Sequence, residues 1–211
     1  MNVETFVVPP LDNNVYLVYD GDAKEAALID SALSAAKVLP RLGERGLSLK
    51  FLVNTHGHAD HVADNARILK ATEAKLAIHE ADAYRLERVS REPRDYLPHL
   101  PPPSKADVLL KEASVVKVGS VELRVLHTPG HTEGSVCFLL PSAGYLFTGD
   151  TLLRGTFGST SGSGSSPAFL FRSLGRLYDL PPETKVLPGH GPPTRLADET
   201  WIANLRYAAP H

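Results

Sequence analysis

The chain contains a single cysteine, Cys137, among its 211 residues. One thiol can form neither an intramolecular disulfide framework nor a cysteine-rich zinc cluster. Cys137 lies in the apolar run of residues 135–140, which predicts a buried strand. We therefore interpret this thiol as a small hydrophobic side chain and not as a nucleophile or a metal ligand.

Long hydrophobic runs are also missing. No segment approaches the roughly 20 apolar residues that a membrane-spanning helix needs. The N-terminal stretch MNVETFVVPP has no basic region, no long apolar run and no small-residue cleavage site, so it does not resemble a signal peptide. We expect a soluble, cytoplasmic protein without a membrane partner.

Excess charge of one sign is absent as well. The formal net charge is −2 with interspersed signs, whereas a nucleic-acid surface is normally visible as a basic stripe. The length fits one large domain or two small ones, and 43% hydrophobic residues can bury a sizeable core. We expect a small-molecule substrate and no nucleic-acid partner, while the oligomeric state is not indicated.

In the first half of the chain, β-rich runs alternate with helical patterns. Gly46 is a stop signal for the first predicted helix, and Pro40 inside that helix predicts a kink or a late start. Residues 90–107 are proline-rich and predict an irregular excursion, from which Arg94, Tyr96 and His99 could face a substrate. Strands are predicted at residues 5–8, 15–19, 26–29, 51–53 and 75–78, and helices at 34–45, 64–70 and 80–89.

In the second half, hairpins precede a helical end. The segment GSTSGSGSS, residues 158–166, has low complexity and is predicted to be mobile, with a lid over the site as a hypothesis. No uninterrupted βαβ series and no G-x-G-x-x-G is present, which disfavours a doubly wound nucleotide fold and favours two sheets flanked by helices. Strands are predicted at residues 115–118, 121–127, 135–140, 145–147 and 185–187, and helices at 166–178 and 196–207.

The densest chemical signal is N-T-H-G-H-A-D-H at residues 54–61, directly after a predicted strand. A polar turn with solvated histidines is one interpretation, because Asn, Gly and Asp are common turn residues. A metal site is the better one, since imidazole nitrogens and carboxylate oxygens are the ligands that Zn²⁺ and similar ions prefer. That interpretation requires further ligands from distant parts of the chain.

Three later strand ends carry such ligands. His131, Asp150 and His190 each follow a glycine just beyond a predicted strand, as expected where the backbone must turn tightly to aim a short side chain at a shared centre. The other histidines, His79, His99, His127 and His211, are not needed to complete a metal site.

Together and in this order, T-H-G-H-A-D-H, T-P-G-H-T, F-T-G-D-T and L-P-G-H-G-P resemble the metallo-β-lactamase superfamily, specifically its glyoxalase II-like (hydroxyacylglutathione hydrolase-like) branch. A-L-I-D at residues 27–30 resembles the first motif of that family. The resemblance covers nearly the whole chain. It implies an α/β protein with a four-layer αβ/βα sandwich of two mixed β-sheets flanked by helices, as a single domain over residues 1–211.

The resemblance also implies a ligand set. His56, His58 and His131 would bind one divalent ion, Asp60, His61 and His190 a second, and Asp150 would bridge both, with Asp60 and Asp150 as the catalytic carboxylates. Asp30 would lie behind the ligands and fix a ligand loop or a histidine tautomer, with an N-cap or turn aspartate as the alternative. Zinc is the expected metal, although iron and manganese suit the same ligands. Substrate-binding residues are not indicated.

Two such ions would supply a shared hydroxide at neutral pH to attack an acyl carbon. A thioester fits best, because a leaving thiolate needs little protonation and no extra general acid is evident. Lactone hydrolysis would use the same centre. The thiol carrier is left open for two reasons: the branch usually has a G-R-T-D-like loop where this chain has G-S-T-S-G, and its longer members carry a C-terminal helical domain that binds glutathione, which we do not expect here.

A second hypothesis is a mononuclear iron persulfide dioxygenase of the same superfamily. It would use only His56, His131 and Asp150, a two-histidine, one-carboxylate set that suits Fe(II) and oxygen. T-L-L-R-G at residues 151–155 bears some likeness to that branch, whereas P-G-H-G-P at 188–192 favours the hydrolases. A non-enzymatic metal-binding protein and a β-lactam hydrolase are disfavoured, the first by the intact ligand set and the second by Asp150, which stands where many of those enzymes have cysteine.

Overall fold

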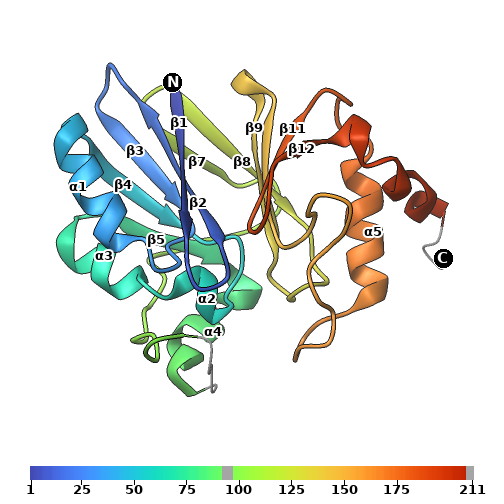
Figure 1. The fold of residues 1–211 in the computed structure, drawn as a ribbon, viewed down its shortest axis with the longest axis horizontal. Helices are drawn as coiled ribbons and strands as arrows, with labels where there is room; N and C mark the ends of the chain where they lie inside the picture. The colour runs from blue at the N-terminus through green and yellow to red at the C-terminus, as the bar shows by residue number, and fades with distance from the viewer. Residues whose placement is uncertain (92–96, 208–211) are drawn as a thin grey trace.

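The computed structural model describes residues 1–91 and 97–207. Two six-stranded sheets pack face to face, and helices cover their outer faces (Figure 1). The predicted four-layer α/β architecture is therefore confirmed. Arg94 and Tyr96 lie outside the described residues, and His99 is exposed in the proline-rich excursion.

The first sheet has its strands in sequence order. Antiparallel pairing joins β1 to β2 and β2 to β3, and parallel pairing joins β3 to β4, β4 to β5 and β5 to β6, so the sheet is mixed. Its strands are β1 Asn2–Val8, β2 Asn13–Asp20, β3 Glu25–Ile29, β4 Ser48–Val53, β5 Lys75–His79 and β6 Val108–Leu110.

The second sheet is also mixed, with the order β12-β11-β10-β9-β8-β7. Only β10 and β11 are parallel, and the other neighbours are antiparallel. The two predicted hairpins are both present, the first turning at Gly119 and the second ending its turn at Gly144. The strands are β7 Val115–Val118, β8 Val121–His127, β9 Val136–Leu140, β10 Tyr145–Gly149, β11 Lys185–Pro188 and β12 Thr194–Arg195.

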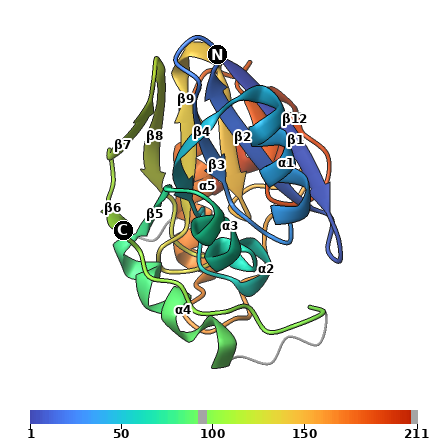
Figure 2. The same cartoon turned by 90° about the vertical axis from the view of Figure 1, so that its left-hand side faces the viewer.

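Helices form the two outer layers. Figure 2 shows α1 and α3 lying across the outer face of the first sheet, and Figure 1 shows α5 on the outer face of the second. No helix among the described residues combines the length and apolar character needed to cross a membrane. The α-helices are α1 Ala35–Arg45, α2 Ala59–Val62, α3 Asn65–Ala71, α4 Ala83–Arg88 and α5 Pro167–Leu177.

Alternation along the strands divides the buried side chains into layers. Leu17 packs toward α1 and α3, whereas its neighbour Val18 packs between the two sheets, because successive strand residues point to opposite faces. Phe138 and Phe147 are fully buried in this inter-sheet core. Cys137, on the other face of β9, is buried against α5, as its apolar surroundings predicted.

The structure corrects several sequence predictions. The first helix starts at Ala35 and runs through Pro40, so the late start was wrong; Asp64 Oδ2 accepts the Ala35 N–H at 2.7 Å and supports its first turn. The segment 80–89 is helical as predicted, but it begins and ends in 3₁₀ geometry, at Glu80–Asp82 (η1) and Val89–Arg91 (η2). The C-terminal tail is 3₁₀-helical over Leu196–Asp198 (η4) and Thr200–Tyr207 (η5). Strands β6 and β12 and the four-residue helix α2 were not predicted, because elements this short leave too little periodicity to detect.

The inter-sheet core yields a stability prediction. Replacing Phe138 with Ala should lower the free energy of unfolding by about 3–5 kcal/mol, because the ring is fully buried and the cavity cannot close. Urea denaturation followed by circular dichroism measures this loss. Phe169→Ala is the matched control, since that ring is 53% exposed and should change the free energy by no more than about 0.5 kcal/mol. Equal losses in the two variants would contradict the assigned core.

Candidate metal centre

Four loops at the ends of strands build the candidate site. The loops follow β4, β8, β10 and β11, as the sequence predicted. Immediately after the first of them, the short helix α2 carries Asp60 and His61 on its single turn. Ser31 and Ala32 both donate their N–H groups to the His61 carbonyl, which attaches this turn to the end of β3.

All seven predicted ligand residues lie together. Each residue offers one ligand atom, and within each of three overlapping groups these atoms lie within 4.8 Å of one another. Asp150 spans the set, with Oδ2 3.5 Å from Nε2 of His131 and Oδ1 3.4 Å from Nε2 of His61. The groups are His56, His58 and His131; His56, His61 and Asp150; and Asp60, His61 and His190.

The site is closed at its back and open on one side. His56 and His61 are buried, whereas the side chain of His190 is 21% exposed. A metal ion or a substrate can therefore approach past His190, while the nitrogen atoms of His56 and His61 are shielded from bulk water.

Three histidines have their outer ring nitrogen bound to an acceptor. Nδ1 of His61 lies 2.9 Å from Asp30 Oδ2, Nδ1 of His131 lies 2.8 Å from the Ser159 carbonyl, and Nδ1 of His190 lies 3.0 Å from the Leu11 carbonyl. A carbonyl or carboxylate oxygen only accepts, so each Nδ1 carries the proton. When the ring is neutral, Nε2 then carries a lone pair that points into the cluster.

His56 has the same tautomer, which Asp30 fixes indirectly through the Thr55 hydroxyl. The Thr55 hydroxyl donates its one hydrogen to Asp30 Oδ2 at 2.8 Å and lies 3.1 Å from Nδ1 of His56. The hydroxyl must therefore accept from that nitrogen. Asp30 Oδ1 also accepts the Thr55 N–H at 2.8 Å. Asp30 thus holds both a ligand loop and a histidine tautomer, the role that the resemblance implied for it.

These tautomers fit a metal centre. Nε2 of His56 lies 3.2 Å from Nε2 of His131, and the same atoms of His61 and His190 are also 3.2 Å apart. Facing lone pairs at this distance repel unless a proton or a cation lies between them. Asp150 Oδ1 is buried without a hydrogen-bond partner, although buried polar atoms are nearly always satisfied. A cation bound to these atoms would resolve both conflicts.

The charges around the ligands agree with this assignment. Burial and the neighbouring His131 lower the pKa of His58 to about 3, so its imidazole is neutral at pH 7, as a metal ligand must be. Burial raises the pKa of Asp150, but His61 and the other histidines outweigh it and lower that pKa to about 2. Burial lowers the pKa of His61, whereas Asp60, Asp150 and Asp30 together raise it well above its usual value. Without a metal these carboxylates hold a proton on His61, and a bound cation would replace it.

Some contributors to the site were not predicted. The Asn13 amide donates to Asp60 Oδ2 at 2.9 Å, and backbone carbonyls of Leu11 and Ser159 hold two of the histidines. The glycine-serine segment also contacts the ligand loops through Gly158 N, which donates to the Asp150 carbonyl, and Ser165 Oγ, which donates to the His131 carbonyl. Its mobility stays a prediction, but these contacts make it part of the site wall.

Glycine is needed before the candidate ligands for two different reasons. Gly130 and Gly149 have φ values of +137° and +48°, which matches the tight turn inferred from the sequence. Gly189 is required by lack of space, because a Cβ there would lie 2.6 Å from Asp150 Oδ1 and 2.7 Å from His61 Cε1.

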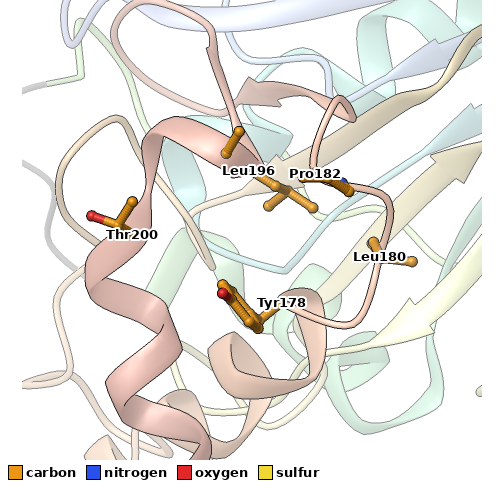
Figure 3. A pocket seen from close by; sticks show the side chains of 6 residues that line it. Tyr178, Leu180, Pro182, Leu196 and Thr200 are labelled. Carbon is orange, nitrogen blue, oxygen red and sulfur yellow. The ribbon is translucent and has the colours of Figure 1, made fainter.

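The remaining described histidines lie apart from the ligand groups. His79 and His127 stack with their ring centroids 3.9 Å apart, and neither belongs to the three groups. A hollow of about 390 Å³ near the end of α5 is also separate from the centre (Figure 3). It is lined by uncharged side chains, those of Tyr178, Leu180, Pro182, Leu196, Ala197 and Thr200.

Comparison with known proteins agrees with this centre. A family model described as the metallo-beta-lactamase superfamily matches residues 8–190. The chain belongs to this superfamily. A hydroxyacylglutathione hydrolase of Cereibacter sphaeroides is 37% identical over 210 residues, which cover 99% of this chain and 71% of that relative. The prediction of a metal-dependent hydrolase is thereby confirmed at the level of the enzyme class.

Solved structures of the superfamily share the whole fold. TTHA1623, crystallised in a di-iron-bound form, has a TM-score of 0.83 and 35% identity, covering 93% of this chain and 96% of that one. The B3 metallo-beta-lactamase BLEG-1 has a TM-score of 0.85 and 27% identity, covering 97% and 99% of the two chains.

The position of Asp30 yields a prediction about metal affinity. Asp30→Asn should weaken metal binding about 10–100-fold, because the amide N–H would face one of three donors and release His61 or Thr55 from its present orientation. Asparagine tolerates the positive φ of +58° at this position, so the backbone should be retained. Competition with a chromogenic chelator measures the affinity. Asp12→Asn is the control at another positive φ, +52°; equal effects of the two changes would contradict the role of Asp30.

Proposed function

We propose that this protein is a dinuclear-metal hydrolase that acts on a small thioester. The observation that carries the proposal is the position of Asp150 between two three-residue ligand groups. One carboxylate oxygen lies near His131 and the other near His61 and His190. A carboxylate in this position can bridge two ions, each of which would keep room for water or substrate.

The proposed ligand assignment follows the two groups. His56, His58 and His131 would hold one ion, Asp60, His61 and His190 the other, and Asp150 both. Zinc is the proposed metal, with iron or manganese as alternatives, since histidine and carboxylate ligands suit all three. When bound, the two ions would make a hydroxide nucleophile available at neutral pH and polarise the acyl oxygen.

The residues of the chain orient and protect this centre. Asp30 and the carbonyls of Leu11 and Ser159 keep the histidine lone pairs directed inward. The Asn13 amide, donating to Asp60 Oδ2, orients a ligand carboxylate. Because such outer contacts are already made before substrate arrives, little rearrangement is needed at the moment of reaction.

The chemistry of the leaving group favours a thioester. A thiolate needs little protonation to depart, and no residue of the seven-ligand cluster is free to act as an additional acid. Burial raises the pKa of the Cys137 thiol to about 11, which removes it as a covalent nucleophile. Hydrolysis would therefore proceed without an acyl-enzyme intermediate.

The substrate proposal rests on similarity as well as on geometry. The Cereibacter sphaeroides relative is named hydroxyacylglutathione hydrolase, and an acylated thiol of this kind is the proposed substrate class. We also propose that the enzyme acts in the cytoplasm and has no nucleic-acid partner. A lactonase-type ester hydrolase would use the same centre. Activity assays with different acyl thiols would identify the acyl group and its carrier.

The rival function is a mononuclear iron persulfide dioxygenase. It would need only His56, His131 and Asp150 as ligands. Asp60, His61 and His190 would then have no metal ion to bind. In this chain those three residues converge as closely as the first group does. Their convergence favours two metals over one.

The first test is hydrolysis of S-lactoylglutathione. Metal-replete protein should cleave it with a kcat/KM in the usual enzyme range, about 10⁴–10⁸ M⁻¹ s⁻¹. Chelator-treated protein should lose the activity, because the nucleophile depends on the metal, and should regain it when zinc or iron is restored. Thiol release, followed with a disulfide reagent, measures the rate. If the replete protein does not cleave this thioester, other acyl thiols and then oxygen consumption with a persulfide become the substrates to test.

The bridging role of Asp150 has its own test. Asp150→Ala should reduce metal content below two ions per chain and lower kcat/KM by more than about 100-fold, which exceeds the usual effect of losing an outer contact. Elemental analysis of dialysed protein gives the stoichiometry. Full metal content with retained turnover would exclude bridging, and a single iron in the wild-type protein would favour the dioxygenase.

A further inference from the structure

A buried ion pair lies behind the three-histidine group and was not predicted from the sequence. Asp82, at the end of the 3₁₀ turn Glu80–Asp82 (η1), has no exposed side-chain surface, and Arg85 on α4 is only 6% exposed. Arg85 Nε lies 3.3 Å from Asp82 Oδ1. Neither residue is a candidate ligand, and burying two charges is costly unless their hydrogen-bonding groups are satisfied.

The Asp82 carboxylate joins two ligand loops. Its Oδ2 accepts the Gly57 N–H at 2.8 Å and the Thr132 hydroxyl at 2.8 Å, and its Oδ1 accepts the Gly134 N–H at 2.8 Å. Gly57 lies between His56 and His58, and Thr132 directly follows His131. One carboxylate therefore connects all three histidines of this group through their neighbouring residues.

Arg85 extends the connection to a third segment. Its Nη2 donates to Glu133 Oε2 at 2.6 Å and to the Ser163 carbonyl at 2.8 Å. Ser163 belongs to the glycine-serine segment, whose Ser159 carbonyl holds Nδ1 of His131. The ion pair thus contacts three segments beside the three-histidine group: the loop after β4, the loop after β8 and the glycine-serine segment.

Two glycines allow this close approach. A Cβ at Gly57 would lie 2.7 Å from Cβ of Arg85, and a Cβ at Gly134 would lie 2.6 Å from Cβ of Asp82. Any side chain at these positions would separate the ligand loops from the ion pair. The loops therefore pack directly on Asp82 and Arg85 through backbone atoms.

The Asp60, His61 and His190 group is held by different residues. Its outer contacts are Asn13, Asp30 and the Leu11 carbonyl. Neither Asp82 nor Arg85 makes a hydrogen bond or ion pair with that group in the described part of the chain. Asp30 reaches His56 as well, through Thr55, whereas the contacts of Asp82 lie beside the three-histidine group.

We propose that Asp82, paired with Arg85, is a positioning residue for the His56, His58 and His131 metal position alone. The inference rests on the two-metal centre of the proposed function. Loss of the Asp82 carboxylate should weaken the ion at this position and leave the ion at Asp60, His61 and His190 in place. Asparagine cannot substitute, because its amide group would direct N–H toward a backbone N–H or the Thr132 hydroxyl and would remove the charge that pairs with Arg85.

The experiment is a metal titration of the Asp82→Asn protein. Zinc binding to the full-length wild type and the variant is measured by competition with a chelator, together with metal content after dialysis. Of the two ions bound by the wild type, one should bind about 10–100-fold more weakly in the variant, the range typical for loss of an outer contact. The other should keep its affinity. The visible spectrum of cobalt-loaded protein should lose the contribution of one site only.

Asp20→Asn is the matched control. Asp20 is also buried, at 7% exposure, and its carboxylate also joins two loops by accepting backbone N–H groups and a hydroxyl, that of Ser120. It lies at the far end of β2 from Asn13 and the ligands. Its loss should lower the melting temperature but leave both ions bound with wild-type affinity.

The outcomes separate this inference from the proposed function. A wild type that binds fewer than two ions would overturn the two-metal centre itself. A wild type with two ions and an Asp82→Asn variant with two ions of unchanged affinity would overturn the positioning role alone, as would equal weakening of both ions or an equal loss in Asp20→Asn. If Asp82→Asn does not fold, Thr132→Val removes one donor to Asp82 at constant shape and should show the same one-site weakening, reduced in size; unchanged binding there would overturn the role.

Discussion

The direction of the imidazole protons is the constraint on which the rest of this structure depends. Four histidines have their Nδ1 protons engaged by oxygen atoms outside the cluster, so their Nε2 lone pairs face one another. That arrangement needs a proton or a cation between the facing nitrogen atoms. Buried hydrogen bonds therefore hold the rings in an orientation that a proton on His61 satisfies in part and that a bound cation would satisfy at both pairs.

The sandwich makes this arrangement possible. The ligand loops follow β4 in one sheet and β8, β10 and β11 in the other, so neither sheet alone carries the set. Packing of side chains such as Val53 and Phe147 between the sheets sets the distance between the loops. Any loss of that packing would separate His56 and His61 from His131, Asp150 and His190. Core packing and metal binding are therefore coupled in this protein.

The sequence indicated the candidate ligands more readily than the residues that support them. His56, His58, Asp60 and His61 lie in one short run, and the later ligands repeat a strand-glycine-ligand pattern, so both are visible locally. Every residue has a backbone carbonyl, so no sequence pattern indicates that those of Leu11 and Ser159 will bind His190 and His131. Asp82 has the ordinary appearance of an aspartate at the start of a helix. Its role exists only because the fold brings it to Gly57 and Gly134.

The same limit applies to the fold. Long strands and α5 carried clear alternation or helical periodicity and were predicted, whereas β6 and β12 are formed by pairing with a neighbour and have little pattern of their own. The C-terminal tail was predicted as a helix, and it forms a 3₁₀ helix that packs against α5. Short elements are decided by tertiary contacts, which a local pattern does not contain.

The contacts behind the candidate ligands are of two kinds: a shared contact supports both ligand groups, and a private contact supports only one. This difference bears on how the number of bound metal ions could change in this fold. Asp30 is shared, because it holds His61 directly and His56 through Thr55. Asp82 contacts residues next to the three histidines, and Asn13 contacts Asp60 and lies beside His190. If the proposed two-metal centre holds, a change at a shared support would affect both ions, whereas a change at a private one would affect a single ion and leave the ligands themselves intact. On this proposal, the number of metals that the chain binds would depend on the residues behind the ligands as well as on the ligand motifs.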